Sequence, residues 1–293
     1  MTRMNRRNFI KQTSLAGVAA AVAVAAPRAH AEEPMTQAMP RIKLAHFEVS
    51  RLILGSNPFW GYAHQPGTDL EKQQKQFYTD ERIMAVLDDA AARGITAVSV
   101  PPDKRWFGIW TRYKANGGKM ADWISQPMPR PEGMKGDIDA SVKNGAKAVY
   151  VQGHCVEEQF EGNTFDVVRG WVEYIRSCGV AAGIAAHRPD VHPEAQKRGF
   201  PVDFYFQCCY NVAHGDVYTE DDRRKAVETL RQLEKPVIMY KVLGAGRVSP
   251  KDGFEYVFPH LKAKDGMCVG VFPKDNPNQV REIADQAVRL SAK

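Results

Sequence analysis

One stretch decides the fold of this chain: Val202-Asp203-Phe204-Tyr205-Phe206-Gln207-Cys208-Cys209-Tyr210-Asn211. The run is short, apolar and rich in aromatic residues, so it predicts a β-strand that is buried on both faces. Its polar residues gather at its end, where a parallel strand delivers side chains to a pocket. For this run alone, the alternative is a core strand whose Tyr210 and Asn211 satisfy local hydrogen bonds.

The chain around this stretch alternates strands with helices. Short apolar runs predict eight strands, at 51–55, 96–100, 122–126, 148–153, 181–186, 202–208, 236–241 and 268–272. Apolar periodicity and capping residues predict helices at 80–92, 138–144, 165–177, 193–197, 221–233 and 278–290. Eight buried strands that alternate with helices predict an α/β fold, a single (β/α)8 TIM barrel preceded by an export signal. The connection from 101 to 120 is expected to be a long loop with four aromatic residues.

The beginning of the chain has the features of an export signal. A twin arginine, Arg6-Arg7, precedes an apolar segment at 15–26, which is too short to span a bilayer core of about 30 Å. Ala29-His30-Ala31 fits a signal-peptidase site. A membrane anchor is the alternative. The expected organisation is a twin-arginine signal peptide at 1–31, a linker at 32–44 and the barrel at 45–293. The protein would then use the twin-arginine export machinery and be periplasmic or otherwise exported.

Removal of residues 1–31 would bring the formal net charge of the chain close to zero. The full sequence has a formal net charge of +6, and five basic residues but no acidic ones lie within 1–31. The mature chain of 293 − 31 = 262 residues therefore carries 6 − 5 = +1. A nearly neutral domain lacks the basic surface of nucleic-acid-binding proteins. The expected partner is a small-molecule substrate, with no nucleic acid and, after signal cleavage, no membrane; the oligomeric state stays open.

The cysteines and histidines do not form a disulfide framework or a metal motif. Five cysteines in a long chain are an odd number, and most are expected to be small buried groups, with one disulfide left open. The histidines, Cys208 and acids such as Glu157 show no compact metal-binding spacing. No metal site is therefore predicted.

Six segments follow one another along the mature chain: 49–55, 92–96, Val151-Gln152-Gly153-His154, a Gln-x-x-Tyr-Asn pattern at 207–211, 240–246 and 276–282. In this order they resemble the aldo/keto reductase superfamily over nearly all of the mature chain. They correspond to its first strand, the lead into its second strand, its histidine-bearing strand, its Gln-x-x-Tyr-Asn signature, its cofactor loop and its adenosine-binding segment. The resemblance implies a (β/α)8 barrel. It also implies NADP(H) as a possible cofactor, bound by Gln207, Tyr210, Leu243, Lys274 and Asn278.

The residues that perform the family's chemistry are largely replaced. The family uses an Asp, Tyr, Lys and His tetrad, and the resemblance places Ser99, Lys104 and Gln126 at the first three positions. Only His154 is kept. Carbonyl reduction needs a proton donor, and a positioned acid contributes about 10²–10⁴-fold. Ordinary NADPH-dependent reduction is therefore not the expected activity.

Residues at the strand ends are the candidates for other chemistry. His154, Lys241 and His187 are expected to be catalytic, with His154 as the acid/base group and the other two polarising oxygens. Burial lowers the pKa of a lysine readily, which makes Lys241 a possible base or electrophile. Stacking on a substrate ring is expected from Trp60, Trp106, Trp110 and Tyr210. The alternative in each case is structural: a core histidine, a surface lysine or aromatic packing over the barrel.

Three functions follow from these observations. The first is an exported barrel enzyme that acts on a carbohydrate or similar polyhydroxyl carbonyl compound by histidine-centred acid/base chemistry. The second is an oxidoreductase with tightly held NADP(H), carried through export in the folded protein. The third is a non-catalytic sugar-binding barrel.

Overall fold

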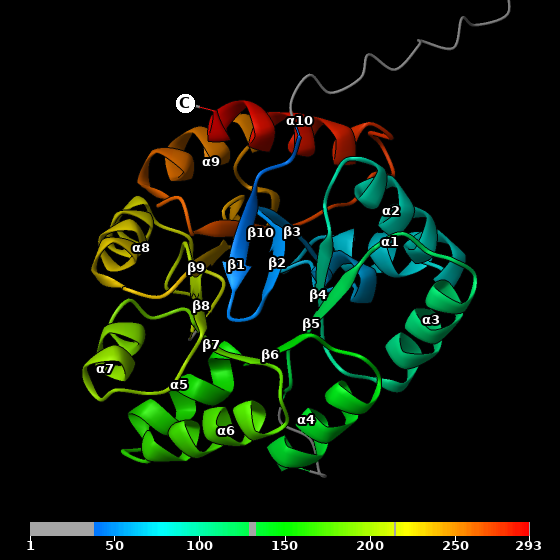
Figure 1. Ribbon diagram of the computed structural model, residues 1–293. Coiled ribbons are helices and arrows are strands. Elements are labelled where there is room, and N and C mark those ends of the chain that lie inside the picture. The colour runs from blue at the N-terminus through cyan, green and yellow to red at the C-terminus, as the bar shows by residue number, and fades with distance from the viewer. Residues whose placement is uncertain (1–37, 129–132, 214, 293) are drawn as a thin grey trace, which may run out of the picture. The chain divides into compact units, whose positions relative to one another are not determined.

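The computed structural model describes residues 38–128, 133–213 and 215–292. Within them, eight parallel strands close into a barrel in the order β10-β3-β4-β5-β6-β7-β8-β9, and helices surround it (Figure 1). The predicted (β/α)8 barrel is therefore confirmed. The signal peptide expected at 1–31 lies outside the described residues. No helix in the described ranges is long and apolar enough to cross a membrane.

The barrel strands differ from the predicted ranges by at most two residues at either end. They are β3 (Leu52–Gly55), β4 (Ala97–Val100), β5 (Asp122–Ser125), β6 (Ala148–Val151), β7 (Ala181–Ala186), β8 (Phe204–Cys208), β9 (Val237–Tyr240) and β10 (Gly266–Gly270). All residues of β8 are buried, as are those of β3, β4, β6 and β7. This burial arises because one strand face points into the barrel and the other is covered by helices.

A β-hairpin that the sequence did not predict fills one end of the barrel. Strands β1 (Arg41–Leu44) and β2 (Phe47–Ser50) pair antiparallel and lie across the barrel in Figure 1. The prediction of a linker at 32–44 is therefore wrong for residues 41–44, which form strand β1. Two exposed and two buried residues alternate along β1, and four residues are too few for period-2 alternation to identify a strand.

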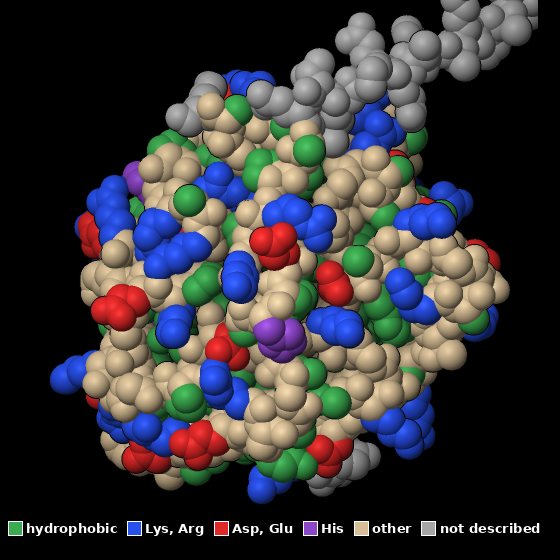
Figure 2. All heavy atoms as spheres, in the orientation of Figure 1, with side chains coloured by type: hydrophobic (Ala, Val, Ile, Leu, Met, Phe, Trp, Pro, Cys, Tyr) green, Lys and Arg blue, Asp and Glu red, His purple; other side chains and the backbone are tan. Residues whose placement is uncertain are grey.

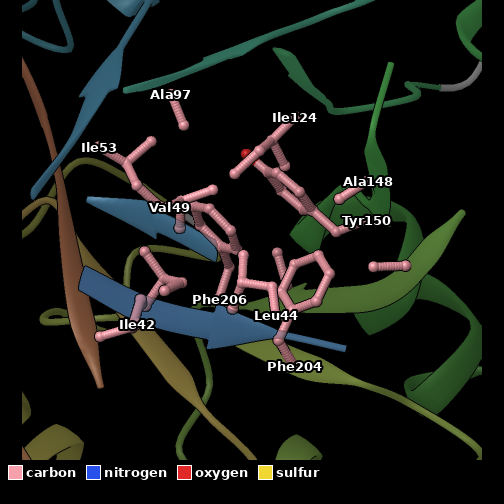
Figure 3. Packing of buried hydrophobic residues seen from close by; sticks show 13 residues of the cluster. Ile42, Leu44, Val49, Ile53, Ala97, Ile124, Ala148, Tyr150, Phe204 and Phe206 are labelled. Carbon is pink, nitrogen blue, oxygen red and sulfur yellow. The ribbon is translucent and has the colours of Figure 1, made fainter. Parts of the chain in front are cut away.

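The buried side of the hairpin continues the barrel core. Leu44 and Val49 belong to one apolar cluster with the barrel residues Ile124, Phe204 and Phe206 (Figure 3). The face of the molecule that carries the hairpin shows Lys and Arg side chains interspersed with Asp and Glu (Figure 2). The hairpin therefore occupies one end of the barrel with apolar side chains, and the other end is left for a site.

The helices include four that were not predicted. They are α1 (Leu70–Phe77), α3 (Lys104–Ala115), α5 (Gly153–Glu161) and α9 (Pro250–Val257). The predicted helices appear as α2 (Asp80–Ala92), α4 (Gly133–Lys143), α6 (Asp166–Ser177), α7 (Val191–Lys197), α8 (Glu220–Gln232) and α10 (Gln279–Ser291). Helix α6 packs beside β6 and β7, and α10 beside α2 and α9.

The prediction of a long loop at 101–120 is wrong, because most of this segment forms helix α3. Asp103 caps the helix by accepting a hydrogen bond from the backbone N–H of Trp106 at 2.9 Å. Trp106, Trp110 and Tyr113 recur at helical spacing, so they share one buried face. This spacing is the sequence signal that identifies α3 as a helix.

All five cysteines are free thiols. Cys155, Cys208 and Cys209 are buried, as expected for small apolar groups, and the disulfide left open by the sequence does not form. Burial raises the pKa of Cys155 and of Cys208 to about 12. These thiols are therefore protonated near neutral pH and are not prepared as nucleophiles.

Leu44→Ala is expected to lower the free energy of unfolding by about 2–5 kcal/mol, because it opens a cavity between the hairpin and the barrel. Leu44 is fully buried, whereas its neighbour Lys43 is exposed. The matched variant Lys43→Ala should change stability by less than about 0.5 kcal/mol. Chemical denaturation followed by circular dichroism measures both. Equal stability of the two variants would show that the hairpin is not part of the core.

Candidate active site

A cavity of about 540 Å³ lies at the carboxyl ends of the barrel strands. Small-molecule sites typically measure about 300–1,000 Å³, and (β/α)8 enzymes keep their chemistry at this end. The cavity is lined from the barrel interior by Ser99, Tyr150, Phe206, Tyr240 and Cys268. The rings of Tyr150 and Phe206 stack with centroids 4.0 Å apart and form a flat apolar surface.

His187, the residue that follows β7, lines this cavity. Its Nδ1 lies 3.0 Å from Glu157 Oε2, and the two side chains are 14% and 3% exposed. A carboxylate only accepts hydrogen bonds, so the proton of the imidazole is assigned to Nδ1. Nε2 is therefore left as the basic nitrogen, able to take a proton from a bound molecule.

Glu157 holds the end of β7 as well as the imidazole. Its Oε1 accepts the backbone N–H groups of His187 and Arg188, the latter at 2.8 Å. Burial by itself raises the pKa of Glu157, but the hydrogen bonds from His187 and the two backbone groups outweigh it and lower the pKa below its ordinary value. An ionised Glu157 stabilises the imidazolium that forms when His187 accepts a proton.

The close approach of α5 to His187 depends on Gly153. A Cβ on Gly153 would lie 3.2 Å from Cε1 and Nδ1 of the His187 ring. Such a contact is tighter than ordinary van der Waals packing, so a side chain at 153 would displace the imidazole. Glycine at the first position of α5 therefore lets Glu157 reach the end of β7.

Lys241 directly follows β9 and also lines the cavity. Its Nζ lies 5.9 Å from the centroid of the Tyr218 ring. Burial lowers the pKa of Lys241, and attraction by Cys208, Asp216 and Glu157 offsets only part of that effect. The amine is therefore easier to deprotonate than a surface lysine.

A second histidine–carboxylate pair lies at the rim. His64 Nδ1 is 3.0 Å from Asp216 Oδ1, and Asn57 Nδ2 lies 3.3 Å from His64 Nε2. Burial lowers the pKa of His64, and the nearby Lys241 lowers it further, while Asp216 opposes both. His64 is thus neutral near pH 7, with both ring nitrogens engaged, and it fixes the position of Asp216.

The loops after β3 and β9 are tied together across the cavity mouth. Gln65 Nε2 donates to the Ala245 carbonyl at 2.6 Å, and Arg247 Nη2 donates to the His64 carbonyl at 2.9 Å. His64, Lys241 and Ala245 have left-handed backbone angles, with φ of 51°, 54° and 54°. This conformation costs a non-glycine residue about 1–3 kcal/mol and persists only where its surroundings enforce it, most often at functional sites.

The structure corrects the expected position of His154. His154 lies in the first turn of α5, is exposed and does not line the cavity. The reason is local, because β6 ends at Val151 and the chain enters helix α5 at Gly153. His187 lines the cavity instead, and of the three predicted catalytic residues the structure brings together only His187 and Lys241.

The expected stacking residues do not line the cavity. Trp106 and Trp110 stack on each other with ring centroids 5.4 Å apart, and Trp106 also packs against Trp123. Both belong to the buried face of α3, outside the barrel. Trp60 lies under the guanidinium of Arg105, 4.9 Å from its ring centroid. The rings that do line the cavity are those of Tyr62, Tyr150, Phe206, Tyr240 and Phe272.

The residues expected to hold the nicotinamide do not fit that role in this arrangement. Tyr210 is only 2% exposed, and its ring packs against Tyr218 at 5.0 Å between centroids. Gln207 is fully buried and its Nε2 donates to the Cys208 carbonyl at 3.0 Å. Neither residue lines the cavity. A nicotinamide ring that stacked on Tyr210 would have to displace Tyr218.

The other expected cofactor residues lie at the edge of the site. Leu243 lines the cavity. Lys274 and Asn278 are exposed, and Lys274 Nζ donates to Gln73 Oε1 at 2.9 Å. Helix α1, which carries Gln73, therefore lies beside the segment expected to bind the adenosine end of a dinucleotide. These exposed side chains can bind a polar group at the edge of the site.

The histidines and acids considered as metal ligands do not form a metal-binding group in the described structure, and the absence of a metal site stays a prediction. Among the described residues, no three His, Cys, Asp or Glu side chains are grouped so that they could hold a metal ion. His192, another candidate ligand, is fully buried, and its Nε2 lies 3.0 Å from the Phe206 carbonyl oxygen. Burial lowers the pKa of His192 to about 4, so it is a neutral core residue.

Sequence reasoning missed Glu157, His64, Tyr150 and Tyr240 as members of the site. The two tyrosines stand on strands that were predicted correctly, and their inward direction follows from the strand register. Tyr150 Oη lies 2.8 Å from Ser99 Oγ. Burial raises the pKa of Tyr240 well above its ordinary value, so its phenol remains a proton donor.

Lys241→Met is expected to stabilise the protein near pH 7. Between its lowered folded pKa and the unfolded value of about 10.4, Lys241 binds fewer protons in the folded state, so the stability of the unsubstituted protein rises with pH. The advantage of the variant should therefore be greatest below the folded pKa and shrink as pH approaches 10.4. Each unit by which the pKa is lowered corresponds to about 1.4 kcal/mol.

Denaturant unfolding between pH 6 and pH 10 measures this difference. The matched variant Lys197→Met removes a lysine whose side chain is 80% exposed and should show no such pH dependence. A constant difference between Lys241→Met and the unsubstituted protein at every pH would contradict the prediction.

Comparison with known proteins supports the fold. Neither protein-family models nor curated proteins give a match to the sequence. Among solved structures, a Pseudomonas aeruginosa protein named as a candidate aldo-keto reductase superposes with a TM-score of 0.64 at 16% identity, covering 89% of this chain and 100% of that chain. The holo form of an aldo-keto reductase from Bacillus halodurans gives 0.58 at 13%, covering 85% and 90%. The chain is therefore a divergent (β/α)8 barrel with the fold of the aldo-keto reductases, as its sequence motifs predicted.

Proposed function

We propose that this protein is an enzyme that moves protons on a small polyhydroxyl carbonyl compound. The observation that carries the proposal is that the Glu157-bound His187 and the lysine Lys241 line one cavity at the strand ends of the barrel. A base and a proton donor on opposite sides of a bound carbonyl compound are what enolisation requires. The carbonyl-side donors are Lys241 and the phenol of Tyr240.

His187 is the base in this reaction. Its Nε2 removes a proton from the carbon next to the carbonyl, and the resulting imidazolium is stabilised by the ionised Glu157. Glu157 itself keeps its charge throughout and holds the imidazole in one tautomer. The same nitrogen can return the proton to another atom of the substrate, which gives isomerisation or epimerisation.

Lys241 and Tyr240 stabilise the oxygen on which negative charge develops. Such groups act strongly inside a cavity because water that would screen them is excluded. The Tyr240 and His187 rings lie edge to face with centroids 5.7 Å apart, so the two groups border the same space. A carbonyl compound bound in this space would contact both rings and lie in the cavity that Lys241 also lines.

The remaining lining of the cavity supports a polyhydroxyl substrate. Asn57, Gln126 and Gln152 supply amide donors and acceptors that suit hydroxyl groups, and the stacked Tyr150 and Phe206 supply an apolar surface. A mixture of amides and aromatic rings without a cluster of cations suits a neutral polyhydroxyl compound better than a multiply charged one. The twin-arginine pattern at Arg6-Arg7 supports the proposal that the enzyme acts after export.

His187→Gln is expected to slow proton exchange by about 10²–10⁴-fold, since it removes the base. The reaction is the exchange of carbon-bound hydrogen of dihydroxyacetone in heavy water, followed by NMR. His154→Gln and His46→Gln alter exposed histidines outside the cavity and should leave the rate unchanged.

A loss of exchange in His154→Gln but not in His187→Gln would reverse the assignment of the base. Binding of the sugar without exchange in the unsubstituted protein would instead indicate a non-catalytic sugar-binding barrel.

An oxidoreductase is the second candidate, because the fold is that of the aldo-keto reductases and because Tyr240, Lys241 and His187 line one cavity. Together they supply the proton donor that the sequence lacks at the positions of Ser99, Lys104 and Gln126. The packing of Tyr218 on Tyr210 opposes a bound nicotinamide. No step of the proposed reaction uses one.

Denaturation of the purified, folded protein decides between these candidates. If the acid/base proposal is right, the released small molecules should not show the ultraviolet absorbance of reduced nicotinamide. Addition of NADPH should also leave the melting temperature of the protein unchanged. The variant Tyr218→Ala uncovers the ring of Tyr210. The same two measurements on this variant show whether NADPH binds once that ring is accessible. Release of one nicotinamide per chain from the unsubstituted protein would favour the oxidoreductase.

A further inference from the structure

Lys241 is a partly buried cation that forms no ion pair with an acid among the described residues. Among the residues in 38–128, 133–213 and 215–292, no carboxylate oxygen lies within ion-pair distance of its Nζ, and no hydrogen bond from Nζ to a protein acceptor is formed. Its Nζ lies 5.9 Å from the centroid of the Tyr218 ring. A buried ammonium ordinarily pairs with a carboxylate, because removing a charge from water is costly.

The charged groups around Lys241 are all engaged with other partners. Glu157 binds His187 and two backbone N–H groups, and Asp216 binds His64. Arg247 donates to the carbonyls of Gly244 and His64 and lies over the Tyr218 ring. The remaining neighbour, Cys208, is a buried thiol whose pKa is raised to about 12. None of these groups fully offsets the burial of the ammonium, so the pKa of Lys241 stays below its ordinary value.

The backbone fixes where the amine is presented. Lys241 has a φ of 54°, which β-strand residues do not adopt, so the chain turns sharply at the end of β9. The carbonyl of Lys241 accepts the backbone N–H of Gly244 at 2.8 Å, which closes this turn. The side chain therefore enters the cavity from one rim position, near the ring of Tyr240 and the imidazole of His187.

We infer that Lys241 forms a covalent imine with the carbonyl carbon of an aldehyde or ketone bound in this cavity. The inference deepens the proposed function, since it uses the same site and the same class of polyhydroxyl carbonyl compound. It differs from that function in assigning Lys241 a bond to carbon, where a hydrogen bond to oxygen suffices for simple enolisation. It also defines the substrate as a compound with an open, unhydrated carbonyl group.

The bonding changes balance without any further reactant. The lone pair of Nζ adds to the carbonyl carbon, and one proton passes from nitrogen to oxygen, which gives a carbinolamine. A second proton, which Nε2 of His187 takes from the Lys241 ammonium before the addition and then delivers to the hydroxyl, lets that oxygen leave as water while the C=N bond forms. The protonated imine then accepts the electron pair released when His187 removes a proton from the adjacent carbon. Addition of water to the C=N bond restores the amine and the carbonyl.

An electrostatic role is the competing account of an unpaired lysine. In that account the ammonium stays protonated and pairs with an anionic substrate such as a carboxylate. The two accounts differ in one observable: an imine is reduced by cyanoborohydride to a stable secondary amine, whereas an ion pair is not.

Reductive trapping tests the inference on the full chain in its folded state. The protein is incubated with dihydroxyacetone and sodium cyanoborohydride at pH 7, digested and mapped by tandem mass spectrometry. The peptide that contains Lys241 is expected to carry the reduced adduct in at least about ten-fold excess over peptides with surface lysines, which are almost fully protonated at this pH. Pyruvate serves as an anionic carbonyl probe in a parallel reaction.

Matched variants assign the adduct. Lys241→Arg and Lys241→Met should lose it, and Lys197→Arg, at a residue whose side chain is 80% exposed, should keep it. Because the adduct is mapped in the unsubstituted protein, the conclusion does not depend on the folding of a variant. The rate of trapping should reach half its maximum at a lower pH at Lys241 than at surface lysines.

Each outcome decides the inference. No adduct at Lys241, with dihydroxyacetone or with pyruvate, overturns it, and a pyruvate-induced rise in melting temperature would then support the ion pair. Labelling of Lys241 no faster than of Lys197 overturns it as well. Proton exchange that depends on His187 without any adduct would refute the imine and leave the proposed function intact. An adduct at Lys241 without proton exchange would confirm the imine and remove the proposed function.

Discussion

The carboxylate of Glu157 is the constraint on which the candidate site depends. It reaches from α5 to the end of β7, binds the imidazole of His187 and accepts two backbone N–H groups there. This single interaction fixes the tautomer of His187, joins two neighbouring strand ends and leaves Lys241 without a partner. If Glu157 reached Lys241, the site would contain an ordinary buried ion pair and an unoriented histidine.

The two ends of the barrel differ in how their interior is filled. At one end the hairpin β1–β2 fills the interior with Ile42, Leu44 and Val49, and this end contributes stability. At the other end the interior is left open, polar side chains enter it, and three non-glycine residues adopt left-handed backbone angles. An unpaired lysine and a strained rim reduce stability, which is the usual cost of a functional site.

The likeness to solved aldo-keto reductases shows the barrel fold and leaves the chemistry of the strand ends to be tested. One fold supports many reactions because the groups at the ends of the strands vary while the barrel persists. Here the strand ends carry Ser99, Gln126, Gln152 and His187, and Tyr218 covers Tyr210. The site is thus explained by its own side chains, and the proposed proton transfers use only groups that line the cavity.

The sequence by itself determined the eight barrel strands, because each is a short apolar run whose burial is independent of its partners. It also located Lys241 and His187 at strand ends, since the end of a parallel strand is fixed once the strand is known. It did not determine the hairpin or α3, because β1 is only four residues long and the aromatic residues Trp106, Trp110 and Tyr113 of α3 were expected in a loop.

Only the tertiary structure decided that Glu157 orients the imidazole of His187 in the cavity and that Lys241 has no carboxylate partner among the described residues. His154 and His187 look equivalent in sequence, but α5 begins at Gly153 and turns His154 to solvent while bringing Glu157 to His187. Pairing between residues 30 positions apart depends on how helices pack against strand ends, and local sequence patterns do not encode that distance.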